Sequence, residues 1–122
     1  MAKSKVVPHV FREEIDRLTL VHGTPSIPIT VNGRLSRSIA RTKWKVGFAT
    51  VEVDVNPDLA YMDERAIIET ARHEFAHVLE WYHHRTSGHG ARWKLYARLT
   101  GAVPRATSTE QERIQATIEG SQ

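Results

Sequence analysis

The segment from residue 64 to residue 83 places the strongest limit on how this chain can fold. Asp63 stands before it with a side chain suited to capping a helix. Thr86-Ser87-Gly88 follows it and favours a chain reversal. Within the segment, apolar residues recur at the spacing of one helical face: Ile67, Ile68, Ala71, Phe75, Val78, Leu79 and Tyr82. The sequence therefore predicts a long amphipathic helix that buries one side against the rest of the domain.

The segments around this helix predict an α+β domain. Val53 and Val55 alternate with acidic residues, as in a strand with one face exposed to solvent. Asn32-Gly33 is a strong turn signal. We therefore expect antiparallel strands between residues 27 and 55, joined as a hairpin or a small meander. Further helices are expected at the N-terminus and in the C-terminal part, over residues 8–21, about 90–100 and about 108–119.

Length and composition point to one intracellular domain. The chain has 122 residues, of which 40% are apolar and 25% charged, the balance of an ordinary globular protein. It contains no cysteine, so disulfides, thiolate metal sites and cysteine nucleophiles are excluded. No apolar run is long enough for a membrane span, and no secretory signal opens the chain. We expect a single, cytoplasmic, monomeric domain over residues 1–122, with its core over about 8–106 and a short helical tail over 107–122.

The predicted long helix carries a pattern of residues that suits a metal ion. His73 and His77 lie four residues apart, and Glu74 directly follows the first of them. That spacing puts the two imidazoles on one face, about 6 Å apart along the axis, where both can reach one ion. Imidazole suits zinc, and a catalytic zinc has three protein ligands and one position open for water. Glu74 lies at the edge of the same face, so its carboxylate can hold that water without binding the metal. The alternative is a helix with two ordinary surface histidines.

The third ligand must come from another part of the chain. His84 lies on the same helical face as His77 but about 10 Å further along the axis, so it cannot share the ion if the helix continues to this residue. His89 follows the predicted reversal at once and would return over the open side of the site. We therefore expect His73, His77 and His89 to bind one Zn²⁺ ion. A downstream glutamate is the weaker alternative: Glu110, Glu112 or Glu119.

Other groups that a catalytic site would need stay unassigned at this point. Three tyrosines are candidates for stabilising an oxyanion, although packing is the better interpretation of each: Tyr61, Tyr82 and Tyr96. Two glutamates are candidates for orienting the histidines: Glu69 and Glu80. Two histidines outside the cluster are expected at the surface: His9 and His22.

Charge alternates along the chain in three blocks. Residues 18–51 and 81–109 carry basic charges and no acid, whereas acids are in excess over residues 52–80. Basic stretches can bind phosphate backbones, although a solvated surface is the plainer interpretation. Trp44 faces away from the neighbouring lysines on an alternating strand, so we expect it in the core. The candidate contacts to nucleic acid are Arg37, Arg41, Lys43, Lys45 and Arg92.

The histidine motifs together resemble the SprT-like, or Spartan-type, metallopeptidase domain. That family pairs H-E-x-x-H, here residues 73–77, with a downstream G-H-G-x-x-[FW], here residues 88–93. The hairpin that leads to Asn56-Pro57 and the turn over residues 99–104 extend the resemblance to about residues 8–106. The resemblance implies a small zincin-like fold.

The resemblance also implies residue roles and an activity. His73, His77 and His89 would be zinc ligands, and Glu74 the general base of peptide hydrolysis. Family members are best known as DNA-dependent proteases that degrade proteins crosslinked to DNA. Many of them continue into a cysteine-rich zinc ribbon that helps to hold DNA, and this chain without cysteine contains no such ribbon.

Three functions stay open on the sequence alone. The first is a zinc metallopeptidase that acts on DNA-bound or DNA-crosslinked proteins, with single-stranded or damaged DNA as a second partner. The second is a zinc-containing nucleic-acid-binding or adaptor module without protease activity, which a fourth protein ligand such as His84 would support. The third is a general peptidase without a DNA partner. Glu74 favours an enzyme, because a structural zinc site needs no general base.

Overall fold

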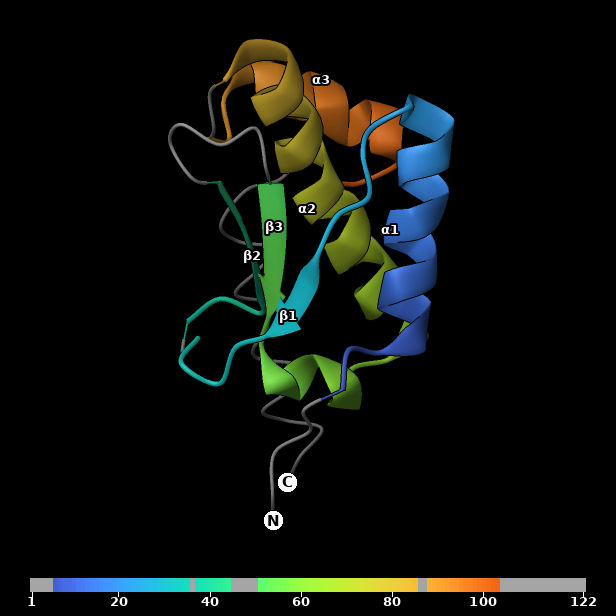
Figure 1. The fold of residues 1–122 in the computed structure, drawn as a ribbon, viewed down its shortest axis with the longest axis vertical. Helices are drawn as coiled ribbons and strands as arrows, with labels where there is room; N and C mark the ends of the chain where they lie inside the picture. Colours follow the sequence, from blue (N-terminus) through green and yellow to red (C-terminus); the bar gives the residue numbers. More distant parts are fainter. Residues whose placement is uncertain (1–5, 36, 45–50, 86–87, 104–122) are drawn as a thin grey trace.

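The computed structural model describes residues 6–35, 37–44, 51–85 and 88–103. Their elements, in chain order, are α1 (His9–His22), β1 (Ile29–Val31), β2 (Ala40–Trp44), β3 (Val51–Val55), the 3-10 helix η1 (Pro57–Tyr61), α2 (Glu64–His84) and α3 (Ala91–Thr100) (Figure 1). The described part of the chain is an α+β fold with three α-helices and one three-stranded sheet, so the predicted class is confirmed. The helix predicted over residues 108–119 lies outside the described residues.

The helices begin and end close to where local sequence signals predicted. Gly23 ends α1 in the left-handed conformation, with a φ of 69°, and Gly101 ends α3 in the same way, with a φ of 83°. The Asp63 side chain caps α2 by accepting a hydrogen bond from the Ala66 N–H at 2.8 Å. None of the described helices is both long and apolar enough to cross a membrane.

The strands follow the order β1-β3-β2 in the sheet. β2 and β3 are antiparallel, with Ala40 opposite Val55, as the predicted hairpin requires. β1 lies on the other side of β3 and runs parallel to it, with Ile29 opposite Val53. The prediction of an entirely antiparallel hairpin or meander was therefore wrong. The sheet is mixed, β3 is its central strand, and β2 is an edge strand.

The connection between β1 and β2 accounts for this topology. The predicted turn does form, because Oδ1 of Asn32 accepts a hydrogen bond from the Arg34 N–H at 3.0 Å. The chain does not return beside β1, because Asn56, directly after β3, holds the connection. Its Nδ2 donates to the Leu35 carbonyl at 2.9 Å and to the Ser38 carbonyl at 3.3 Å. These bonds carry the chain past the end of β3, so β2 forms on the opposite edge.

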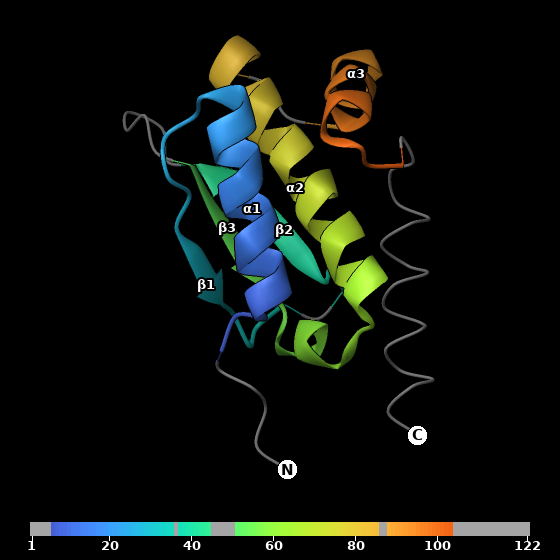
Figure 2. The ribbon, with the colours of Figure 1, turned by 90° about the vertical axis from the view of Figure 1, so that its right-hand side faces the viewer.

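Helices α1 and α2 cover one face of the sheet, and α3 lies beside α2 on the side away from α1 (Figure 2). The main core fills the space between the sheet and the first two helices, with buried residues that include Phe11, Ile15, Leu18, Val51, Val53, Val55, Phe75 and Val78. A second cluster joins α2 to α3 and consists of Ala76, Trp93, Ala97 and Ala102. Because α2 packs on both sides, every residue from 73 to 80 is buried.

Trp44 lies at the end of β2 and is partly buried against the main core. Its ring stacks on that of Trp81, with 4.4 Å between the centroids and 20° between the planes. This position confirms that Trp44 packs on the domain, on the opposite face of the strand from Arg41 and Lys43.

Candidate metal centre

The H-E-x-x-H residues lie on α2 and are almost fully buried. His73 is 0% exposed, Glu74 2% and His77 6%. Thr42 of β2 and Trp93 of α3 lie against this face, so these residues are not the ordinary surface histidines of the alternative interpretation. Burial first, and then the neighbouring His73 and His89, lowers the pKa of His77 from 6.5 to about 3. His77 is therefore neutral near pH 7, which is the form of imidazole that binds metal.

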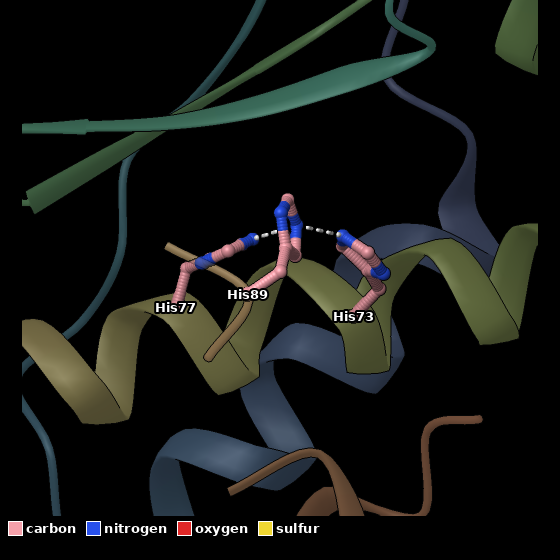
Figure 3. Close-up of side chains that lie close together, drawn as sticks. All are labelled: His73, His77 and His89. Atoms are coloured by element: carbon pink, nitrogen blue, oxygen red, sulfur yellow. Dashed lines mark hydrogen bonds between the residues drawn. The ribbon is translucent and has the colours of Figure 1, made fainter. Parts of the chain in front are cut away.

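His89 completes a group of three histidines (Figure 3). It comes from the segment between α2 and α3, after Arg85 has ended α2 in the left-handed conformation. Its Nε2 lies 3.1 Å from Nε2 of His77 and 3.3 Å from Nε2 of His73. The possible ligand atoms of all three residues lie within 4.8 Å of one another. The structure thus brings together the three histidines that the sequence singled out.

The spacing of these nitrogens fits a single metal ion. Two nitrogens bound tetrahedrally at about 2.0–2.1 Å from one zinc ion stand about 3.3 Å apart. The two distances at His89 Nε2, 3.1 Å and 3.3 Å, are close to this value. A hydrogen bond accounts for only one of them, because an imidazole nitrogen has either one proton or one lone pair. The three histidines can therefore hold one metal ion.

Trp93 supports all three imidazoles from α3. The indole is 0% exposed. Its ring centroid lies 4.8 Å from that of His73, 5.5 Å from that of His77 and 4.8 Å from that of His89. A large rigid ring in contact with three smaller ones limits their rotation, so the nitrogens stay directed at a common point.

Glu74 places its two carboxylate oxygens in different surroundings. Its Oε2 lies 3.9 Å from Nε2 of His73, one of the three histidines. Its Oε1 accepts a hydrogen bond from the Thr42 hydroxyl at 3.1 Å. Sequence reasoning did not identify Thr42 as a site residue. In the sequence, its only signal was a place on the inward face of the predicted strand. The contact joins residues 32 positions apart, so no local motif marks it.

His84, the suggested fourth ligand, takes part in a different contact. Its Nε2 lies 2.9 Å from the Tyr96 hydroxyl, and the ring of His83 stacks on Tyr96 at 5.6 Å with 8° between the planes. Among the described residues, only His73, His77 and His89 form a group that could share an ion. The late glutamates, the other suggested ligands, lie outside the described residues.

The structure also places Glu69 and His22, for which the sequence analysis gave expectations. Glu69, a candidate for orienting the histidines, accepts a hydrogen bond from the Val103 N–H at 2.7 Å. It therefore ties the end of α3 to α2. His22 was expected at the surface, but it is half-buried, with its ring 5.8 Å from that of Phe75. This histidine is therefore part of the packing of α1, and its burial lowers the pKa of the imidazole.

The basic residues of β2 lie beside acids on the outer face of the sheet. Asp54 is 1% exposed and pairs with Arg41 at 3.3 Å and with Lys43 at 3.2 Å, and Lys43 also lies 3.7 Å from Glu52. Burial by itself raises the pKa of Asp54, but hydrogen bonds from Asn32, Lys43 and Arg41 outweigh it and lower the pKa. The acids therefore offset part of the positive charge that the sequence pattern suggested for this face.

The other candidate contacts to nucleic acid lie elsewhere. Arg37 is exposed in the connection before β2, and Arg92 is exposed in the first turn of α3, directly before Trp93. Lys45 lies outside the described residues. A role for these residues in binding nucleic acid stays a prediction.

Comparison with known protein families gave one match. The sequence model of the SprT-like family matches residues 7–117. The matched range contains the three histidines, Glu74 and all three described α-helices. Comparison with curated proteins and with solved structures gave no match. The resemblance inferred from the two histidine motifs is thereby confirmed.

Proposed function

The chain belongs to the SprT-like family, and we propose that it is a zinc-dependent peptidase with a small zincin-like active site. The observation that carries the proposal is the group of nitrogens on His73, His77 and His89, within 4.8 Å of one another and beside the buried carboxylate of Glu74. Three imidazoles leave a tetrahedral zinc one position for water. A structural zinc site takes four protein ligands, so three ligands and an adjacent carboxylate favour catalysis over a binding module.

The proposed mechanism assigns one role to each group. Zinc, when bound by the three histidines, would polarise the scissile carbonyl and lower the pKa of a water molecule toward about 7. Glu74 would take a proton from this water at Oε2, the oxygen on the side of His73. The resulting carboxylic acid would then give the proton to the leaving amine. Trp93 would keep the three imidazoles in place through both steps.

We propose proteins bound or crosslinked to DNA as the substrate, and single-stranded or damaged DNA as a second partner. The support is the SprT-like membership together with the exposed Arg37 and Arg92. Electrostatic contacts to phosphates would make DNA binding weaken steeply as salt rises. We propose that the enzyme acts as a monomer in the cytoplasm.

Cleavage of a basic DNA-binding protein by the purified, zinc-loaded chain tests the proposal. The reaction is run with and without single-stranded DNA and at two salt concentrations. Glu74→Gln is the matched control, because it keeps the size of the side chain and removes the base. We expect Glu74→Gln to bind zinc as the wild type does and to lose at least about a hundredfold in kcat.

The outcomes separate the three functions. Cleavage that needs both Glu74 and DNA supports a DNA-dependent peptidase. Cleavage at the same rate with and without DNA, and at both salt concentrations, supports a general peptidase and contradicts the proposed DNA partner. A zinc-loaded wild type that cleaves nothing, or a Glu74→Gln protein that cleaves at the normal rate, contradicts the proposed mechanism.

A further inference from the structure

We propose that Thr42 is a positioning residue for Glu74, a role that rests on the proposed peptidase function. Thr42 belongs to the edge strand β2, whereas Glu74 belongs to α2. The Thr42 hydroxyl lies 3.1 Å from Oε1 of the Glu74 carboxylate and 3.1 Å from the Glu74 backbone carbonyl oxygen. A hydroxyl has one proton to donate, and the carboxylate is the stronger of these two acceptors, so the hydrogen bond from the strand goes to the side chain of Glu74.

The contact gives the two carboxylate oxygens different roles. The last torsion of a glutamate side chain is broad and roughly two-fold, so an unrestrained carboxylate samples many orientations. A hydrogen bond from Thr42 to Oε1 selects one orientation, with Oε2 3.9 Å from Nε2 of His73. Oε2 is then the oxygen beside His73, one of the three candidate ligands, where a water molecule would be activated.

Burial increases the value of this hydrogen bond. Glu74 is 2% exposed, so bulk water does little to solvate or orient its carboxylate. The Thr42 hydroxyl supplies a fixed donor, which stabilises the charged form before proton transfer. When Oε2 takes the proton, a water O–H bond breaks and an Oε2–H bond forms. The hydrogen bond at Oε1 persists, so the acid stays directed toward the leaving amine.

The same hydroxyl also contacts the Glu74 backbone carbonyl oxygen, so the positioning role has to be separated from a purely structural role. Two substitutions separate the roles. Thr42→Ser keeps the hydroxyl and removes a methyl group, whereas Thr42→Val keeps the branched shape and removes the hydroxyl. Thr30→Val makes the second change at an exposed position of β1 in the same sheet and is the matched control.

The experiment measures kcat and KM on a fluorogenic arginine-rich peptide, and zinc affinity by chelator competition. We expect Thr42→Val to lower kcat about tenfold to a hundredfold, the size of effect that misplacing a reacting group produces. KM and zinc affinity should stay within about twofold, and Thr42→Ser should keep kcat within about threefold of the wild type. A Thr42→Val protein with normal kcat, or a Thr42→Ser protein that loses as much as Thr42→Val, overturns the inference. If Thr42→Val does not fold, Thr42→Ala replaces it with the same expectations.

A spectroscopic measurement on the metal-free protein is independent of activity. Glutamate is labelled with ¹³C at Cδ, and the Glu74 signal is identified by its loss in Glu74→Gln. This signal should shift in Thr42→Val and stay in place in Thr42→Ser and Thr30→Val. If the Glu74 signal does not move in Thr42→Val, the positioning role of Thr42 is refuted, whereas the proposed peptidase function is not. A wild type that cleaves nothing refutes the peptidase function, and with it the catalytic meaning of the contact.

Discussion

Trp93 offers a perturbation whose size follows from its surroundings. The indole is fully buried and packs against the imidazoles of His73, His77 and His89. Replacing a buried tryptophan by alanine costs about 3–5 kcal/mol, because contacts are lost and a cavity remains. In a domain of this size, 1 kcal/mol corresponds to about 4 °C in Tm, so Trp93→Ala should lower Tm by about 12–20 °C.

Urea unfolding of the metal-free protein, followed by circular dichroism, measures the loss in the free energy of unfolding. Leu95→Ala is the control on the same helix, since Leu95 is 54% exposed and its truncation should cost less than about 0.5 kcal/mol. Trp93→Phe keeps an aromatic ring against the histidines, so it should lose less than about half as much as Trp93→Ala. A loss of about 1 kcal/mol or less in Trp93→Ala would show that this indole does not support the site.

Three further predictions concern stability. Because burial and the neighbouring histidines lower the pKa of His77 to about 3, the unfolded chain binds a proton below about pH 6.5 that the folded chain does not. The metal-free protein should therefore lose stability as pH falls from about 6.5 toward 3, by up to about 1.4 kcal/mol per pH unit, and a His77→Asn protein should lose less in pH-dependent urea unfolding. Asp63→Ala removes the cap on the Ala66 N–H and should cost about 1 kcal/mol in the same assay. Asp54→Asn removes the buried partner of Arg41 and Lys43 and should cost about 1–3 kcal/mol at pH 7, a difference that shrinks in acid as the wild-type carboxylate is protonated.

The helices were predictable because their signals are local. The cap at Asp63 and the left-handed glycine at position 101 act within one helical turn of the boundaries that they set. The apolar spacing along residues 64–83 gave α2 and its buried face for the same reason. His89 was predictable because a chain reversal had to follow α2 before another histidine could reach His73 and His77.

The sheet order was not predictable, because it depends on contacts between distant residues. The turn at Asn32 looked like the turn of a hairpin, and nothing near it in the sequence indicates that Asn56 holds the following connection. The same limit applies to Thr42, whose hydroxyl reaches a carboxylate 32 residues away. A single threonine in a strand belongs to no sequence motif that would predict such a contact. The near-complete burial of the histidine face was missed because covering it takes two elements, β2 and α3.

X-ray absorption at the zinc edge of the purified protein is the most direct test of the site formed by His73, His77 and His89. We expect one zinc ion per chain, with three imidazole nitrogens at about 2.0–2.1 Å and one further light atom from solvent. His89→Ala should then lower the number of imidazole ligands to two and weaken zinc binding, whereas His84→Ala should leave the spectrum unchanged. A fourth imidazole ligand, or a His89→Ala protein with the wild-type spectrum, would contradict the three-histidine site on which the proposed peptidase depends.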